Sequence, residues 1–129
     1  MNKAIIDNLI KIADEAKNNA YCPYSRFPVG AALLTKKKGV FTGVNVENAS
    51  YGLSICAERV AVGKAVSDGV TDFIALAVVA DKNGILPCGA CLQVLSEFSG
   101  NLEIIYKIKN GKITITKLKD LIPKRFKLN

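Results

Sequence analysis

The stretch Phe73-Ile74-Ala75-Leu76-Ala77-Val78-Val79-Ala80 decides the fold class of this chain, because it is apolar without interruption. It falls far short of the ~20 residues that a membrane-spanning helix needs. A strand that is apolar on both faces belongs in the middle of a sheet whose two faces are covered by helices. We therefore expect a central strand over residues 72–80 in a three-layer α/β/α domain.

The segments on either side alternate between helical and extended patterns. Apolar residues at helical spacing and helix-end signals predict helices over residues 2–18, about 56–67, about 88–98 and 118–121. Extended apolar runs bounded by turn residues predict further strands over residues 29–35, 40–46, 102–108 and 112–116. The first two of these strands should form a hairpin at Lys38-Gly39, and residues 81–84 a turn. This order predicts one α/β domain over residues 1–129.

Composition and charge are those of an ordinary globular protein. The chain has 129 residues, of which 50% are hydrophobic and 22% charged. Its net charge of +7 permits a nucleic-acid partner, but the basic residues gather at 36–38 and near the C-terminus, where we interpret them as solvated turn and tail charges. Asp7 interrupts the apolar run that a signal peptide would need. We expect a cytoplasmic protein with neither a membrane nor a nucleic-acid partner.

Cysteine is the residue type that points to chemistry. The sequence has no His, which excludes every site that depends on imidazole. Its four cysteines are Cys22, Cys56, Cys88 and Cys91. In a cytoplasmic chain of this size, such cysteines indicate metal or redox chemistry before disulfides.

Two cysteine motifs stand at the starts of two predicted helices. They are Cys56-Ala57-Glu58-Arg59 and Pro87-Cys88-Gly89-Ala90-Cys91. A helix N-terminus favours thiolates, and two helices on one face of a sheet can bring their N-termini together. Three converging thiolates suit Zn²⁺ and leave its fourth position open for water. Glu58 is close enough in sequence to reach that water without binding the metal.

These motifs follow the signature of zinc deaminases, and the chain resembles the small cytidine deaminases of pyrimidine salvage. Three further segments match that family: the N-terminal substrate loop, the ribose-binding segment and the C-terminal element. They are Arg26–Gly30, Asn45–Ala49, and Leu121-Ile122-Pro123 with Phe126. The resemblance implies a cytidine deaminase-like fold with a mixed five-stranded sheet. It also implies hydrolysis of cytidine and 2′-deoxycytidine to uridine and 2′-deoxyuridine.

The resemblance also implies roles at the metal. Cys56, Cys88 and Cys91 would hold one Zn²⁺ per subunit. Glu58 would act as the proton shuttle, while zinc-activated hydroxide attacks C4 of cytosine. Arg59 would donate hydrogen bonds to the cysteine sulfurs and so offset their negative charge.

Substrate-binding residues are predicted from the residue pattern and from the family resemblance. Asn45 and Glu47 alternate with valines, so in an extended segment both polar side chains point the same way, where they suit the 3′-hydroxyl of a sugar. The family implies that Phe27 stacks on the base and that the Ala57 N–H and the Leu86 carbonyl bind its edge. It further implies that Tyr51 and Phe126 reach a neighbouring subunit's pocket in a homotetramer with shared active sites.

Other interpretations remain open. Cys22 is expected to be idle, but as a fourth ligand it would close the site and abolish catalysis. Cys88-Gly89-Ala90-Cys91 also fits a redox module, and the zinc could belong to a non-catalytic binding protein. The substrate could instead be a base in a polynucleotide or a nucleoside antibiotic such as blasticidin S. Leu92 stands where the family usually has Arg, which removes a polar contact.

Overall fold

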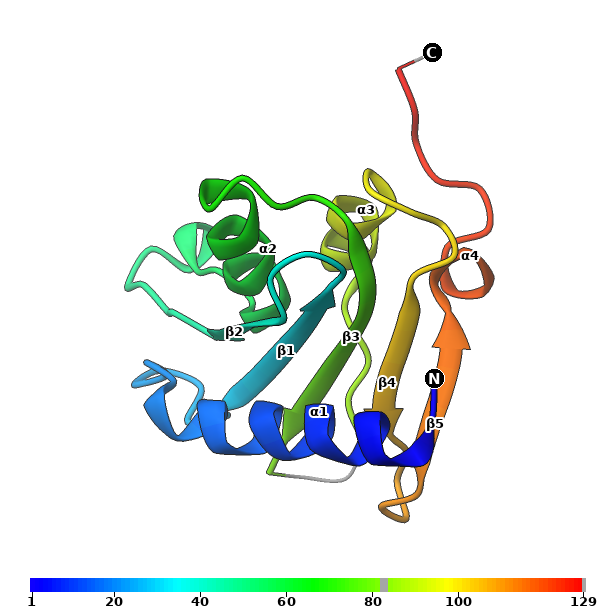
Figure 1. The fold of residues 1–129 in the computed structure, drawn as a ribbon. Helices are drawn as coiled ribbons and strands as arrows, with labels where there is room; N and C mark the ends of the chain where they lie inside the picture. The colour runs from blue at the N-terminus through cyan, green and yellow to red at the C-terminus, as the bar shows by residue number, and fades with distance from the viewer. Residues whose placement is uncertain (82–83, 129) are drawn as a thin grey trace.

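The structure is a computed structural model that describes residues 1–81 and 84–128 (Figure 1). Helices and strands follow one another largely as the sequence predicts. They are α1 (Lys3–Ala16), β1 (Val29–Thr35), β2 (Val40–Val44), α2 (Ala57–Ser67), β3 (Phe73–Ala80), α3 (Gly89–Ser96), β4 (Glu103–Lys107), β5 (Ile113–Lys117) and α4 (Leu118–Leu121). Two short 3₁₀ helices, η1 (Lys17–Asn19) and η2 (Tyr51–Leu53), lie in segments predicted as a helix end and a loop.

The five strands form one mixed sheet in the order β2-β1-β3-β4-β5. β3 occupies the centre, as its uninterrupted apolar sequence predicts, and most of its side chains are buried. It pairs in parallel with β4, while β1–β2, β1–β3 and β4–β5 are antiparallel. The α/β class and the mixed five-stranded sheet are therefore confirmed.

Helices cover both faces of this sheet. Figure 1 shows α1 crossing one face, with α2 and α3 on the opposite side. α1 buries Leu9, Ile10 and Ala13 in one cluster, and α2 and α3 contribute Ala61 and Leu95 to the other. Two separate apolar clusters explain why the central strand is apolar on both faces.

Gly43 lets the start of α2 approach the sheet closely. A Cβ atom on this β2 residue would lie only 2.1 Å from the Ala57 carbonyl oxygen. No side chain fits there, so glycine allows the first turn of α2 to pack directly against the β2 backbone. The position of that turn matters for the site described below.

The predicted element ends differ from the observed ones by a few residues. β2 ends at Val44 rather than at residue 46, and α3 ends at Ser96 rather than at residue 98. Residues 82 and 83 of the predicted turn lie outside the described residues. In the described part of the chain, none of the helices combines the length and apolar character needed to cross a membrane.

Candidate functional site

The two cysteine motifs lie at the starts of α2 and α3. Cys56 and Cys88 are the N-cap residues, with extended backbones, rather than members of the first helical turns, and only Cys91 lies inside a helix. Neither N-cap thiol caps its helix with a hydrogen bond. Both thiols are therefore free to interact elsewhere.

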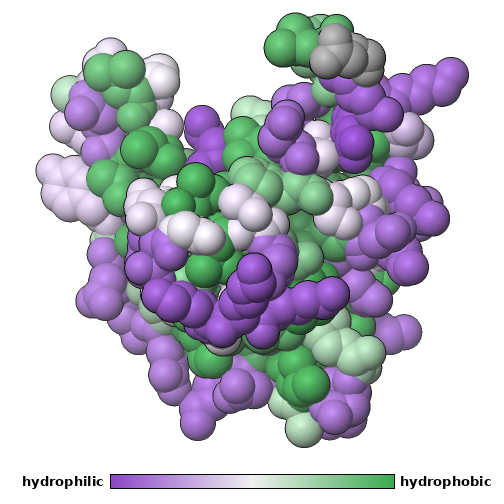
Figure 2. Space-filling view, turned by 45° about the horizontal axis from the view of Figure 1, so that its top comes forward, coloured by the Kyte–Doolittle hydropathy of each residue, from purple (hydrophilic) through white to green (hydrophobic). Residues whose placement is uncertain are grey.

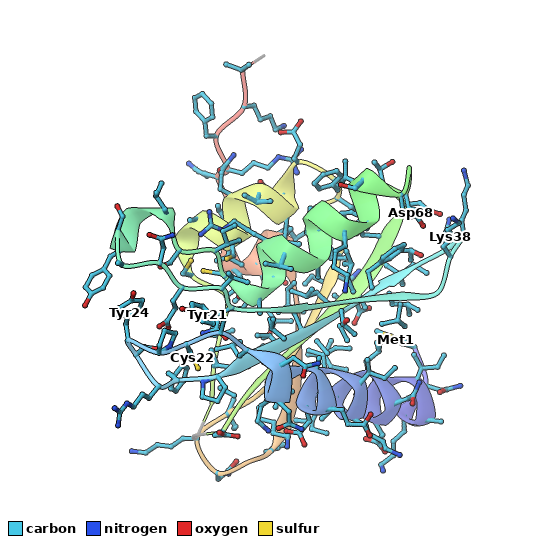
Figure 3. All side chains as sticks on the ribbon, turned by 90° about the vertical axis from the view of Figure 1, so that its left-hand side faces the viewer. Met1, Tyr21, Cys22, Tyr24, Lys38 and Asp68 are labelled. Carbon is cyan, nitrogen blue, oxygen red and sulfur yellow. The ribbon has the colours of Figure 1, made fainter. Side chains whose placement is uncertain are left out.

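The sulfurs of Cys56, Cys88 and Cys91 form one cluster, within 4.8 Å of one another. The Cys88 and Cys91 sulfurs are 3.6 Å apart. Two thiolates bound at ~2.3 Å to one tetrahedral zinc ion would be about 3.8 Å apart, so this donor set fits zinc. Cys22 is not part of the cluster, and Figure 3 shows its sulfur apart from those near α2 and α3. Within residues 1–81 and 84–128, the arrangement therefore offers three candidate ligands, the ones that the sequence predicts, and no fourth from Cys22.

Charge around the sulfurs favours a thiolate at Cys56. A hydrogen bond from Cys91 and the nearby Arg59 guanidinium lower the pKa of Cys56 to about 5. The Nη2 of Arg59 lies 3.6 Å from the Cys56 sulfur, which is the contact expected from the sequence. The pKa of Cys91 is raised, chiefly by its hydrogen bond to Cys56 and by burial. Arg59 thus compensates negative charge on the ligand set.

Glu58 lies in the first turn of α2 and is almost completely buried, with 4% of its surface exposed. Burial raises the pKa of its carboxyl group to about 7. A carboxyl group with a pKa near neutrality can both accept and release a proton. Ala57, beside it, begins the helix and is fully buried, and its N–H is one of those without a partner inside the helix.

A pocket of about 300 Å³ opens next to Glu58 and two of the sulfurs. Four of its lining residues, Cys56, Ala57, Glu58 and Cys88, come from the starts of α2 and α3, and this part of the lining is called the inner end. The remaining lining residues come from the loop before β1, from β1 itself, from the segment after β2 and from the segment before α3. They are Ser25, Phe27, Val29, Asn45, Glu47, Ser54, Ile55, Ile85 and Leu86. The structure thus brings Phe27, Asn45 and Glu47 to the thiol cluster, although they are far from it in the sequence.

Asn45 and Glu47 hold the loop before β1 with their side chains. Asn45 accepts a hydrogen bond from the Val29 N–H at 2.9 Å and donates one to the Phe27 carbonyl at 3.0 Å. Glu47 accepts from the N–H groups of Tyr24 and Ser25 and from the Ser25 hydroxyl. Each side chain keeps spare capacity: one N–H of the amide can still donate and the carboxylate can still accept. A hydroxyl group, which both donates and accepts, complements this pair.

Tyr51 and Phe126 do not line this pocket. Tyr51 is 75% exposed, and its ring packs edge-on against Tyr24 with centroids 6.0 Å apart. Phe126 is 70% exposed, although Gln93 on α3 hydrogen-bonds both its backbone N–H and its carbonyl. In Figure 2, green apolar surface is visible on the face formed by α2, α3 and the C-terminal segment. These two aromatic rings therefore lie outside the pocket that is formed by residues of a single chain.

Sequence reasoning assigned no role to Ser25 or Gln93, which both contact site residues. A signal for Ser25 was present, because a Ser hydroxyl in a turn often accepts the N–H two residues later, and here that residue is Phe27. No comparable signal exists for Gln93, because its partner lies 33 residues away in the sequence. Leu92, which is also on α3, is partly buried and packs against the apolar cluster that contains Ala61 and Leu95.

The chain matches known proteins along most of its length. Residues 4–107 match the family model described as "Cytidine and deoxycytidylate deaminase zinc-binding region". The cytidine deaminase of Sporosarcina psychrophila is 47% identical over 123 residues, covering 94% of this chain and 90% of the relative. That of Halalkalibacterium halodurans is 49% identical over 127 residues, covering 92% and 91%. The crystal structure of cytidine deaminase from Burkholderia pseudomallei superposes with a TM-score of 0.89 at 45% identity, covering 98% of this chain and 100% of that one.

Proposed function

Because the chain belongs to the cytidine and deoxycytidylate deaminase family, we propose that it hydrolyses cytidine and 2′-deoxycytidine to uridine and 2′-deoxyuridine. It is a hydrolytic deaminase with a zinc-binding domain. One observation carries the substrate proposal. A buried carboxyl group and two thiols of the three-cysteine cluster line a pocket whose lining also offers an amide beside a carboxylate. The carboxyl group and thiols suit the reacting ring, and the amide and carboxylate suit a sugar.

Cys56, Cys88 and Cys91 would hold the zinc ion, and Arg59 would offset the charge of the three thiolates. When bound, zinc supplies the acidity that lets a water molecule ionise near neutral pH. Glu58 takes a proton from the attacking water and delivers it to N3 of the base. It then takes the second proton of the same oxygen, from the new hydroxyl on C4, and gives it to the amine; the C4–N bond breaks, ammonia leaves, and C4 keeps the oxygen as a carbonyl. The pKa of about 7 that burial gives Glu58 supports both transfers.

The wall residues bind the nucleoside. The N–H of Asn45 and the carboxylate of Glu47 grip the 3′-hydroxyl, which ribose and deoxyribose share, so both nucleosides are substrates. Phe27 lines the pocket with a ring that is 37% exposed, and it stacks on the base. The Ala57 N–H and the Leu86 carbonyl bind the polar edge of the base, which fixes C4 beside Glu58.

The active assembly is a homotetramer of single-domain subunits, each formed by residues 1–129. Two exposed aromatic side chains, Tyr51 and Phe126, support this proposal, because neither completes the pocket of its own chain. In the assembly they close the pockets of neighbouring copies. The role of the enzyme is pyrimidine salvage in the cytoplasm.

The first experiment follows the ultraviolet absorbance of cytidine with the zinc-loaded protein and with Glu58→Gln. We expect loss of the cytosine band together with ammonia release. In Glu58→Gln, kcat should fall by about 10²- to 10⁴-fold, the usual effect of removing a general acid–base group. The matched control is Glu97→Gln at the exposed C-terminal end of α3, which should behave as the wild type.

Zinc content separates the outcomes. If Glu58→Gln binds zinc normally and has lost turnover, Glu58 acts on the substrate and does not hold the metal. If the zinc-loaded wild type changes neither cytidine nor deoxycytidine, the proposed substrate is wrong.

A further inference from the structure

Ser25 contacts two residues of the proposed nucleoside site, Glu47 at the sugar and Phe27 at the base. Its hydroxyl donates a hydrogen bond to Oε2 of Glu47 and accepts one from the Phe27 N–H at 3.0 Å. Its own backbone N–H donates to Oε1 of Glu47 at 3.0 Å. Among the described residues, no other side chain bonds both Glu47 and the Phe27 backbone. A hydroxyl has one proton to donate, and this one is committed to the carboxylate.

The backbone between these contacts is in an unfavourable conformation. Arg26 has φ of 54°, in the left-handed region that non-glycine residues rarely adopt. Such a conformation persists only where surrounding contacts fix it. Here the Arg26 N–H donates to the Cys22 carbonyl at 2.9 Å, and the Ser25 hydroxyl accepts from the Phe27 N–H. Asn45 holds the C-terminal side through the Phe27 carbonyl and the Val29 N–H.

The ring of Phe27 depends on these contacts for its position. It lies in the pocket lining and belongs to neither buried apolar cluster. The backbone hydrogen bonds at Phe27 set the direction in which its side chain leaves the chain, and so the point from which the ring reaches the pocket. One of these bonds ends on the hydroxyl that also binds Glu47.

We propose that Ser25 is a positioning residue that couples the sugar-binding carboxylate of Glu47 to the base-stacking ring of Phe27. The inference rests on the proposed function for the identity of the ligand, but the coupling itself is a property of the free protein. Without the Ser25 hydroxyl, Glu47 loses a donor, the Phe27 N–H loses its acceptor, and the left-handed conformation of Arg26 loses one of the contacts that hold it.

The kinetic test compares Ser25→Ala with Ser25→Thr, which keeps a hydroxyl. Hydrogen bonds to a charged group are strong enough for Ser25→Ala to raise KM for cytidine about 10- to 100-fold. We expect kcat to change less than about threefold, because the lost contacts bind substrate and transition state alike. Ser25→Thr should restore most of the affinity, and exposed Ser67→Ala at the end of α2 should match the wild type.

A double-mutant cycle tests the coupling itself. We expect Ser25→Ala to have less than a third of its effect on KM in a Glu47→Gln or a Phe27→Ala background, because each second change removes one end of the connection. Full additivity in both backgrounds would overturn the proposal, as would a Ser25→Ala protein with wild-type KM.

A measurement without substrate distinguishes failure of the proposed coupling through Ser25 from failure of the proposed function. In hydrogen exchange followed by NMR, Ser25→Ala should expose the Phe27 amide and speed its exchange about tenfold or more, while Ser25→Thr should not. If the wild type fails to deaminate cytidine but the amide responds in this way, the substrate is wrong and the coupling stands. An unchanged Phe27 amide overturns the coupling, whatever the substrate.

Discussion

Two regions of the proposed site differ in whether contacts within the same chain hold their side chains. The pocket wall formed by the loop before β1 and by Asn45 and Glu47 is held by side-chain hydrogen bonds within the chain. Tyr51 and Phe126, in contrast, are mostly exposed, and Gln93 holds only the backbone of Phe126. The first region is held by contacts that need neither a ligand nor a partner. The second region presents apolar rings to whatever binds there, which is the arrangement expected of groups that work in another copy.

The largest expected effect is at the thiol cluster, which is also formed within one chain. Cys91→Ser should reduce zinc from one ion per chain towards none and abolish turnover, because two thiolates remain where three are needed. A ligand that binds only the folded state at about a thousand times its Kd adds about 4 kcal/mol to the free energy of unfolding. The variant should therefore melt at a lower temperature than the zinc-loaded wild type, as measured by calorimetry.

Chelation distinguishes metal loss from altered packing. A chelator should lower the melting temperature of the wild type and leave that of Cys91→Ser unchanged. The matched control, Cys22→Ser, should keep its zinc, activity and stability, because Cys22 lies outside the cluster. If Cys22→Ser loses both zinc and activity, the three-ligand assignment is wrong.

The next effect tests whether Phe126 works in another chain. In the proposed assembly, Phe126 closes the pocket of a neighbouring copy. Burying a Phe side chain contributes about 1.5–3 kcal/mol, so Phe126→Ala should raise KM about 10- to 150-fold. Co-expression of Phe126→Ala with Glu58→Gln should give more activity than the two variants assayed separately. In the mixed assembly, an intact Phe126 from one chain meets an intact Glu58 in another.

Phe27 provides the contrast, because it lines the same pocket as Glu58 in the same chain. Co-expression of Phe27→Ala with Glu58→Gln should give no such gain, since every chain with an intact Glu58 carries the Phe27 substitution. Equal gains in the two mixtures, or none in either, would remove the distinction between the two regions.

The smallest effect is a shift with pH. The hydroxyl and N–H of Ser25, followed by the N–H of Tyr24, hold the pKa of Glu47 below its ordinary value. The carboxylate therefore stays ionised as the pH falls through the ordinary range for Glu, and its contribution to sugar binding is lost only at lower pH. Without the Ser25 hydroxyl the pKa should rise, so KM of Ser25→Ala should begin to increase at a higher pH than KM of the wild type.

Other titratable groups near Glu47 do not cause the expected difference in KM between Ser25→Ala and the wild type. Tyr24 and Tyr51 share a hollow with it, and Glu58, Cys56 and Cys88 line the inner end of the pocket. All of these groups are the same in both proteins. The comparison of KM between pH 7 and pH 4 therefore reports on Glu47, and superimposable profiles would contradict the assigned role of the hydroxyl.

Local patterns in the sequence predicted much of the fold. The two-sided apolar run at residues 73–80 predicted a central, covered strand. The apolar spacing along residues 2–18 predicted a helix with one buried face, which the structure shows as α1. The ends of helices and strands were less predictable, because tertiary contacts decide at which residue each one ends. β2, for example, ends two residues early, and Val46 instead forms isolated bridges with Tyr21 and Ile55.

By itself, the sequence determined the chemistry available to this protein: three cysteines and a glutamate at two helix starts, and no imidazole. These features are local, since they depend on residue type and on spacing within one helical turn. Only the tertiary structure decided that Cys22 stays apart, that Glu58 is buried deeply enough to raise its pKa to about 7, and that Ser25 joins Glu47 to Phe27. Burial and long-range hydrogen bonds depend on which distant segments the sheet brings together, and no short stretch of sequence specifies that.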